Sequence, residues 1–267
     1  MKKYLKPLLL VSLSVFIPAL VHAQFGFSYG RPFDYSSFWN IDPYKYRFTE
    51  IGIINGFTSP NCEIDYSVSN NNGGYREKTA RGKADLKFNV GLTIGAGIHL
   101  ARLGDKSALG LNINMHYTFT RLVLKSDAFK IKDVIPFNEE LDYSMSSIPI
   151  SIDYKTGAEA ISDRYLKSSF AFGAGIAPRF VAYGLLGGEA TPSISPFLKM
   201  EAGYFVGLGF KIRMLYFVGK QTWDKGYLLQ PVVSNAPIGS EGYYNLSSTG
   251  EFLVSLIVMP YSRAWTD

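Results

Sequence analysis

The fold is decided by residues 86–121, LKFNVGLTIGAGIHLARLGDKSALGLNINMHYTFTR, in which apolar and polar residues alternate. Even-numbered positions are apolar from Leu86 to Leu100, and odd-numbered positions are apolar from Leu109 to Phe119. A period of two predicts β-strands, and both runs are longer than the usual strand of about 5–6 residues. The stretch therefore predicts two long strands separated by a short polar break.

The change of parity across the break predicts how the two strands pair. A two-residue turn at Gly104-Asp105 places even-numbered residues opposite odd-numbered ones, so both apolar sets share one face. The opposite face carries Gly, Asn, Thr, Lys and His, which is typical of a transmembrane β-barrel with a polar interior. This register pairs His99 with Gly110 and His116 with Thr93, so the two histidines lie on the order of 20 Å apart, too far for one metal ion.

The beginning of the chain predicts export. Three lysines precede the apolar core Leu8–Leu20, and Val21-His22-Ala23 forms a small-x-small cleavage site. The core is too short to span a bilayer as a helix. We expect four segments: a signal peptide at 1–23, an aromatic N-terminal segment at 24–47, a transmembrane β-barrel at 48–261 and a C-terminal tail at 262–267.

Composition excludes several classes of function. The signal peptide takes three of the 27 basic residues, so 24 remain against 22 acidic ones and the net charge falls from +5 to +2. No lysine or arginine cluster suggests nucleic-acid binding, and a single cysteine excludes an internal disulfide. The mature chain has no apolar run approaching the roughly 20 residues of a spanning helix. We expect a protein of the bacterial outer membrane, in contact with its lipid.

Alternation along the rest of the chain predicts an all-β, antiparallel up-and-down transmembrane barrel of about eight strands. Its long and short connections alternate, as they do in outer-membrane barrels. The expected strands are 48–58, 86–100, 108–121, 144–155, 168–182, 196–205, 209–219 and 248–261.

Four details of this prediction depend on single turns and loops. Residues 196–219 keep one parity, so they form either one very long strand or two strands joined by a three-residue turn around Val206 to Gly209. Pro149 costs a ladder hydrogen bond and predicts a bulge. The polar loop 59–85 alternates at Glu63–Ser69 and is expected to rise as a β-ribbon. Residues 156–167 are expected to form a turn, with one helical turn at Ala158–Ile161.

The chain resembles the small bacterial outer-membrane β-barrels of the porin-family type. The resemblance covers residues 48–261 and rests on the export signal ending at Ala23-Gln24, on Gly-rich strands such as Phe172–Gly175, and on aromatic strand ends. The Ala-Gln junction and residues 204–216 also resemble barrels associated with type IX secretion and gliding. One departure is the end of the chain at Asp267, where such barrels commonly have a terminal aromatic residue.

Strand parity places many charged side chains inside the predicted barrel. Because an eight-stranded barrel is narrow and buried charges must be paired, we expect an internal ion-pair network. A narrow ion-selective channel is the alternative. The expected members are Glu50, Asp153, Arg179, Lys199, Glu201, Lys211 and Arg213, with Lys87, His116 and Lys155 also on the inward parity.

The sequence contains no motif for catalysis, a cofactor or a metal. The adjacent pair Glu139-Glu140 is typical of a solvated loop, and no motif distinguishes Ser151 or Ser255 as a nucleophile. We therefore expect a protein that is not an enzyme and has a structural or secretion-associated role. Its loops or its aromatic segment 24–47 would bind an envelope or secretion-system protein, unless that segment is only a lead-in at the membrane interface. A passive channel for ions or small solutes is the alternative.

Overall fold

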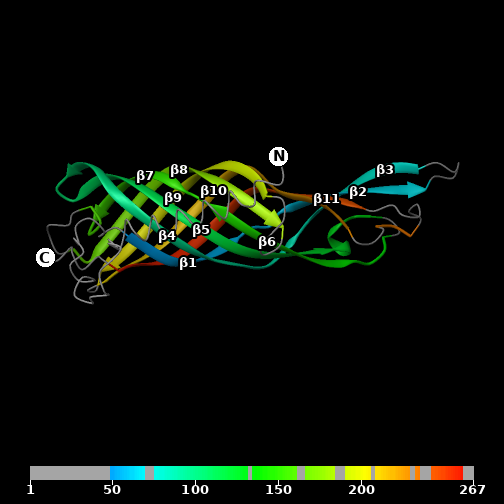
Figure 1. Cartoon of the computed structure of the whole chain (residues 1–267), viewed down its shortest axis with the longest axis horizontal. Helices are drawn as coiled ribbons and strands as arrows, with labels where there is room; N and C mark the ends of the chain where they lie inside the picture. Colours follow the sequence, from blue (N-terminus) through cyan, green and yellow to red (C-terminus); the bar gives the residue numbers. More distant parts are fainter. Residues whose placement is uncertain are drawn as a thin grey trace, which may run out of the picture.

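The chain folds into a closed antiparallel barrel in a computed structural model that describes residues 49–69, 75–131, 134–160, 166–183, 190–205, 208–228, 232–234 and 242–260. Eight strand positions form the ring, in the order β1, β4, β5, β6/β7, β8, β9, β10, β11 and back to β1 (Figure 1). This confirms the predicted all-β barrel of about eight strands. The bounds are β1 (Thr49–Phe57), β2 (Asn61–Ser69), β3 (Tyr75–Lys83), β4 (Asp85–Gly104), β5 (Ser107–Lys125), β6 (Asn138–Ser147), β7 (Ile150–Gly157), β8 (Ser168–Tyr183), β9 (Ala190–Phe205), β10 (Gly209–Tyr227) and β11 (Tyr243–Met259).

The predicted hairpin of residues 86–121 is the pair β4–β5. Its central register joins His99 to Gly110 and Thr93 to His116, as expected from the sequence. The predicted turn is wrong by one residue, because Gly104 pairs with Ser107 and the turn is Asp105-Lys106. Two irregularities between the turn and His99 restore the predicted register, so the apolar residues from Phe88 to Leu100 and from Leu109 to Phe119 still share the outer face.

Two uncertain connections are resolved by the strand pairing. β9 ends at Phe205 and β10 begins at Gly209, so residues 196–219 form two strands joined by a three-residue turn. The predicted bulge at Pro149 is wrong. β6 and β7 keep one register with β5 and with β8, and only the ladder is interrupted because proline has no N–H to donate. After β7 the Ala160 N–H donates to the Gly157 oxygen at 3.0 Å and closes a turn, whereas Ile161, the last residue of the predicted helical turn, lies outside the described residues.

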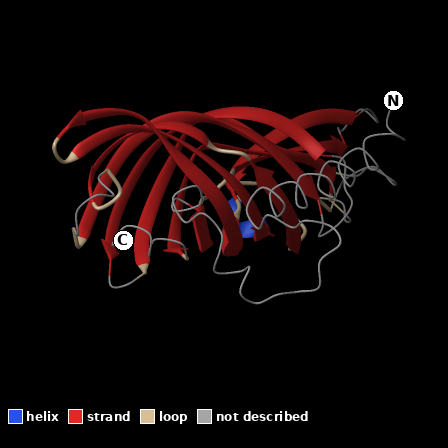
Figure 2. Cartoon of the chain, turned by 60° about the vertical axis from the view of Figure 1, so that its left-hand side comes forward, coloured by secondary structure: helices blue, strands red, loops and turns tan. Residues whose placement is uncertain are grey.

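Part of the molecule extends beyond the ring. β2 and β3 form the expected ribbon, and β2 pairs with the first residues of β11, Tyr243–Ser247. The ribbon projects from one end of the barrel in Figure 1, whereas the turns β4–β5, β7–β8 and β9–β10 lie at the other end. We name these the long-loop end and the short-turn end. Apart from a single 3-10 turn at Ser126–Ala128, the described elements are strands (Figure 2).

The outer surface of the ring is apolar and the interior is largely polar. Isoleucine, leucine, valine, methionine, phenylalanine and tyrosine side chains are exposed around the ring. Examples from six strands are Ile53, Leu92, Ile152, Phe172, Leu198 and Ile212. No helix in the described part of the chain has the length and hydropathy needed to cross a bilayer.

A hydrophobic core fills the long-loop end. We call it the apolar cap. It joins the ribbon to the far ends of β5, β6, β8, β10 and β11, and Trp223 packs edge-on against Tyr143 with ring centroids 6.0 Å apart. Its buried members are Cys62, Ile64, Ala80, Ala84, Leu122, Leu124, Phe129, Leu141, Tyr143, Met145, Val181, Trp223, Leu228, Val232, Val233, Tyr244 and Leu246.

The predicted signal peptide, the aromatic N-terminal segment and the C-terminal tail lie outside the described residues.

Candidate functional site

The charged side chains of the barrel interior gather toward the short-turn end. We call them the lumen network. Alternation along each strand sends every second side chain inward, so charged residues at inward positions of different strands meet inside the ring. The members are Glu50, Asp153, Lys155, Glu159, Lys199, Glu201, Lys211 and Arg213, all almost fully buried.

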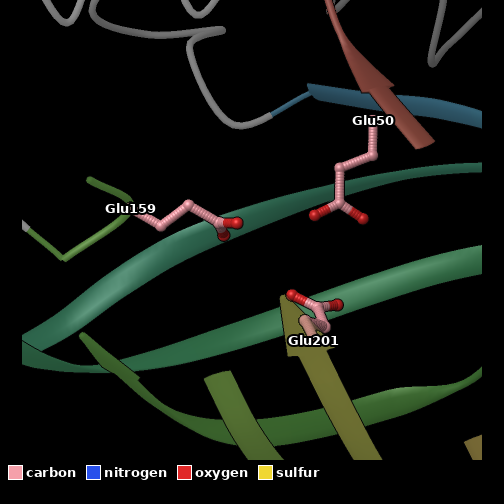
Figure 3. A group of neighbouring side chains, drawn as sticks. All are labelled: Glu50, Glu159 and Glu201. Carbon is pink, nitrogen blue, oxygen red and sulfur yellow. The ribbon is translucent and has the colours of Figure 1, made fainter. Parts of the chain in front are cut away.

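Lys211 is the centre of this network. Its ammonium group forms ion pairs with Glu50, with Glu159 at 3.2 Å and with Glu201 at 3.2 Å. The three carboxylates come from β1, from the turn after β7 and from β9, and Figure 3 shows them converging. One cation from β10 therefore ties together three separate parts of the wall.

Arg213 lies one inward position further along β10 and bridges two of the same acids. Its guanidinium donates to Glu201 and to Glu50, and its third contact is Nη1 to the Asn114 Oδ1 at 2.8 Å. Asn112 in turn donates to Glu50 at 3.3 Å. Bonds to acceptors on β1, β5 and β9 fill the planar fork of the guanidinium, which suits arginine better than lysine at this position.

Two more pairs extend the network around the wall. Lys199 lies 2.5 Å from the Asp153 Oδ2 and 3.3 Å from a Glu201 oxygen. Lys155 lies 3.2 Å from Glu159. The eight members carry four positive and four negative charges, so the buried network is neutral as a whole. Such balance is required of charges removed from water.

Glu159 was missed in the sequence analysis because it lies in a turn, where strand parity says nothing about direction. Gly157 adopts a positive φ of 79°, and a side chain there would collide with the Ser168 backbone. The turn folds back, and Ala158 and Ala160 pack against Phe205, Met259 and Ala108. Glu159 thereby enters the lumen. Its backbone oxygen also lies 2.6 Å from the His99 ring.

Arg179 belongs to a separate buried group that lies nearer the long-loop end of the lumen. It pairs with Glu251 on β11, bonds to Gln221 on β10 and lies 4.4 Å from the centroid of the Phe217 ring. Glu251 was also missed, although its inward parity in the predicted strand 248–261 was a usable signal. Arg179 therefore connects β8 directly to β10 and β11 across the interior.

Three carboxylates of the lumen network lie close enough to hold a metal ion. One oxygen from each of Glu50, Glu159 and Glu201 lies within 4.8 Å of the others. The Lys211 ammonium already contacts all three, and Arg213 contacts two. Since these cations supply the positive charge that a metal would bring, the geometry favours an ion-pair cluster over a metal site.

A wall of uncharged polar side chains lies between the lumen network and the apolar cap. Thr93, His116 and Ser147 are register neighbours on β4, β5 and β6, and each has buried polar atoms without a hydrogen-bond partner among the described residues. Asn89, Thr118 and Thr120 continue the wall. The opposite wall is apolar, formed by Ile54, Ala177, Phe197, Leu215, Phe217 and Leu253.

The structure places all seven residues of the predicted network inside the barrel. Six belong to the lumen network, whereas Arg179 stands apart with Glu251. The inward placement expected for Lys87 is wrong. The register shift between Leu86 and Phe88 turns its side chain to the surface, where it pairs with Glu140 at 2.6 Å.

Comparisons with known proteins were made for the sequence and for the fold. No family model matches the chain, and no curated protein sequence is similar to it. Among solved structures, the outer membrane protein OprG of Pseudomonas aeruginosa matches with 11% identity and a TM-score of 0.38, covering 80% of this chain and 96% of that one. The Escherichia coli outer membrane protease OmpT matches with 9% identity and a TM-score of 0.36, covering 80% and 96%.

A further match is Ail, the attachment invasion locus protein of Yersinia pestis, with 8% identity and a TM-score of 0.22, covering 77% of this chain and 99% of that one. Identities and TM-scores this low do not establish common function, and the barrel architecture rests on the strand pairing described above. None of these three names mentions secretion or gliding, so the type IX association stays a prediction.

One match contradicts the expectation that this chain is not an enzyme. OmpT is a protease, so an outer-membrane barrel can carry a catalytic site. The absence of a motif in the sequence was the only ground for that expectation. We therefore withdraw it. Of the two serines considered, Ser255 is fully buried with no hydrogen-bond partner for its hydroxyl among the described residues, and Ser151 is 2% exposed.

Proposed function

We propose that the chain is an integral outer-membrane β-barrel with a structural lumen, and that it presents the long-loop end to a protein of the envelope or of a secretion system. The observation that carries the membrane assignment is the inversion of polarity across the wall. Apolar side chains point outward around the ring, while the charged side chains of the lumen network are buried inside. Soluble monomers rarely expose contiguous apolar patches larger than a few hundred Å².

The partner role is supported by an ordered sheet that extends beyond the ring. Inside the ring, neutralised ion pairs and a hydrophobic core occupy the two ends of the lumen. Beyond the ring, β2, β3 and the extended ends of β10 and β11 form a sheet that is anchored on the apolar cap. A rigid surface held outside the membrane is suited to recognition.

The membrane assignment is tested by placing a charge at two depths of the same strand. Ile94→Arg lies near the middle of the outward face of β4, and Leu103→Arg lies beside its turn. Arginine on the lipid face costs about 2–4 kcal/mol at the midplane and about 0–1 kcal/mol near the interface. We expect Ile94→Arg to lower the urea midpoint in lipid vesicles far more than Leu103→Arg. Equal effects of the two variants, or a wild-type protein that stays monomeric without detergent, would reject the assignment.

A narrow channel for ions or small solutes is the second candidate. The observation in its favour is the uncharged polar wall, which includes Thr93, His116 and Ser147, because polar groups without protein partners are usually hydrated. Planar-bilayer recordings of the purified protein test it. Defined openings that change size or selectivity in His116→Ala would support the channel, and a silent wild-type protein would exclude it.

A further inference from the structure

Strand edges are unpaired at several places in the described part of the chain, including residues 190–196 of β9, residues 218–227 of β10 and the whole outer side of β3. The pairing of β9 with β10 ends at Phe197 and Phe217, so residues 190–196 of β9 pair only with β8. At the other end of the sheet order, β3 pairs only with β2. An unpaired edge exposes backbone donors and acceptors to any extended chain that meets it, and most proteins protect such edges.

The free edge of β9 is protected by prolines. The Ile148 N–H donates to the Pro178 oxygen at 2.9 Å, so the carbonyl of Pro178 points toward β6/β7. Because backbone groups alternate in direction along a strand, the N–H and C=O groups of Ala177 and Arg179 point toward β9. Ser195 is paired with Ala177, so its backbone groups point toward β8. Pro192 and Pro196 have the opposite parity, and their backbone groups therefore point toward the free edge. Neither has an N–H to offer, so this edge is a poor template for another strand.

The edge of β3 lacks this protection. Its nine residues, YREKTARGK, contain no proline, so every backbone N–H is present. All nine residues of β3 are exposed except Ala80 and Gly82, and Tyr75 is 67% exposed. Figure 1 shows the strand at the outer margin of the projecting ribbon. Ala80 and its β2 partner Ile64 are part of the apolar cap, which holds the edge in place.

The charges on β3 select what could pair with it. Arg81 is neutralised by Glu63 at 2.9 Å, and Thr79 is bonded to Asp65. Arg76, Lys78 and Lys83 have no acidic partner among the described residues. Because Arg76 and Lys78 are two residues apart, they lie on the same face of the strand. β3 carries four basic side chains and one acidic one, Glu77, so two copies of this edge would repel each other through their net positive charge.

We propose that the free edge of β3 binds an extended acidic segment of a partner protein as an added strand. Backbone hydrogen bonds would supply affinity, and acidic residues at alternate positions would face Arg76 and Lys78. The inference deepens the partner role proposed above, on which it rests, by naming the surface and the chemistry of the partner.

The test uses the full-length protein in detergent micelles and synthetic nine-residue peptides of alternating Glu and Val. Two versions of the peptide carry N-methyl groups on its odd or on its even residues, and a further version has Lys in place of Glu. We expect the acidic peptide to bind, one methylated version to lose binding while the other retains it, and the Lys peptide not to bind. Only strand addition makes the two methylated versions differ, because only one edge of the peptide would face β3.

A charge-reversed protein sharpens the test. Arg76→Glu/Lys78→Glu should weaken the acidic peptide about tenfold or more and create binding of the Lys peptide. Lys106→Glu, an exposed change at the short-turn end, is the matched control and should have no effect. No binding of the acidic peptide at millimolar concentration, or equal binding of both methylated versions, would overturn the proposal. The membrane assignment is tested separately by Ile94→Arg, so failure of one does not imply failure of the other.

Discussion

The two ends of the lumen are filled by opposite chemistry. At the short-turn end, eight charged side chains neutralise one another around Lys211. At the long-loop end, the apolar cap fills the interior with hydrophobic side chains, including Leu122 and Leu246. The difference reflects what lies outside each end. We call the ring of exposed apolar side chains the apolar belt. Within the belt the outer face contacts lipid, so the polar side chains point into the lumen. Beyond the belt the outer face contacts water, and hydrophobic side chains fill the interior.

β5 shows the change within one strand. Its inward residues are polar as far as Thr120 and become Leu122 and Leu124, while the outward residues change from Phe119 to Arg121. Arg121 lies on the outer face, bonded to Asp142 at 2.6 Å and 5.5 Å from the centroid of the Phe88 ring. The strand thus changes from a membrane pattern to a soluble pattern at about Arg121, and this residue indicates the boundary of the apolar belt.

The largest effect is expected at the short-turn end. Glu201→Gln removes one charge that Lys199, Lys211 and Arg213 share, and breaking a buried ion pair costs about 3–5 kcal/mol. We expect a lower temperature for conversion of the folded to the unfolded band on a gel. Glu140→Gln, in an exposed pair with Lys87, is the control and should leave that temperature unchanged. An unaltered temperature in Glu201→Gln would show that the network does not stabilise the barrel.

A smaller and more local effect is expected at the long-loop end. Leu246→Ala opens a cavity in the apolar cap, where Leu246 is fully buried, and such changes cost about 2–5 kcal/mol. Because the cap lies outside the belt, we expect faster proteolysis of the ribbon while the barrel band remains heat-modifiable. Loss of the folded barrel band in this variant would mean that the two ends fold as one unit.

The smallest effect concerns the cap's own thiol. Cys62 is fully buried on β2, and burial raises the pKa of the thiol to about 12. Because the thiolate is the reactive form, a maleimide at pH 8 should label the native protein only very slowly. Urea should restore rapid labelling, and so should Leu246→Ala if the cap loosens. Rapid labelling of native wild-type protein would contradict a closed cap.

Parity in the sequence was sufficient to predict the barrel and its inward face. It placed Glu201, Lys211 and Arg213 inside, and it set the β4–β5 register that separates His99 from His116. It failed where alternation is interrupted. Lys87 turns outward at a register shift, and Glu159 lies in a turn that has no parity at all.

Several strands were also predicted too short, again because the apolar alternation is interrupted. β10 continues to Tyr227 and β11 begins at Tyr243, beyond the belt, where outward residues are polar and the apolar alternation is no longer visible. Gly219, with a φ of 96°, lies at an irregularity in the pairing of β10 with β11 and interrupts the pattern further.

The sequence by itself determined that this chain forms long strands with an apolar outer face and a polar inner face, because a period of two is a local property of the chain. Only the tertiary structure decided which inward charges meet. Glu50 and Lys211 are 161 residues apart, and their ion pair exists because ring closure brings β1 and β10 to opposite sides of β11. The order of strands in the sheet likewise leaves β3 with a free edge, since pairing partners are set by the whole sheet and not by any one strand.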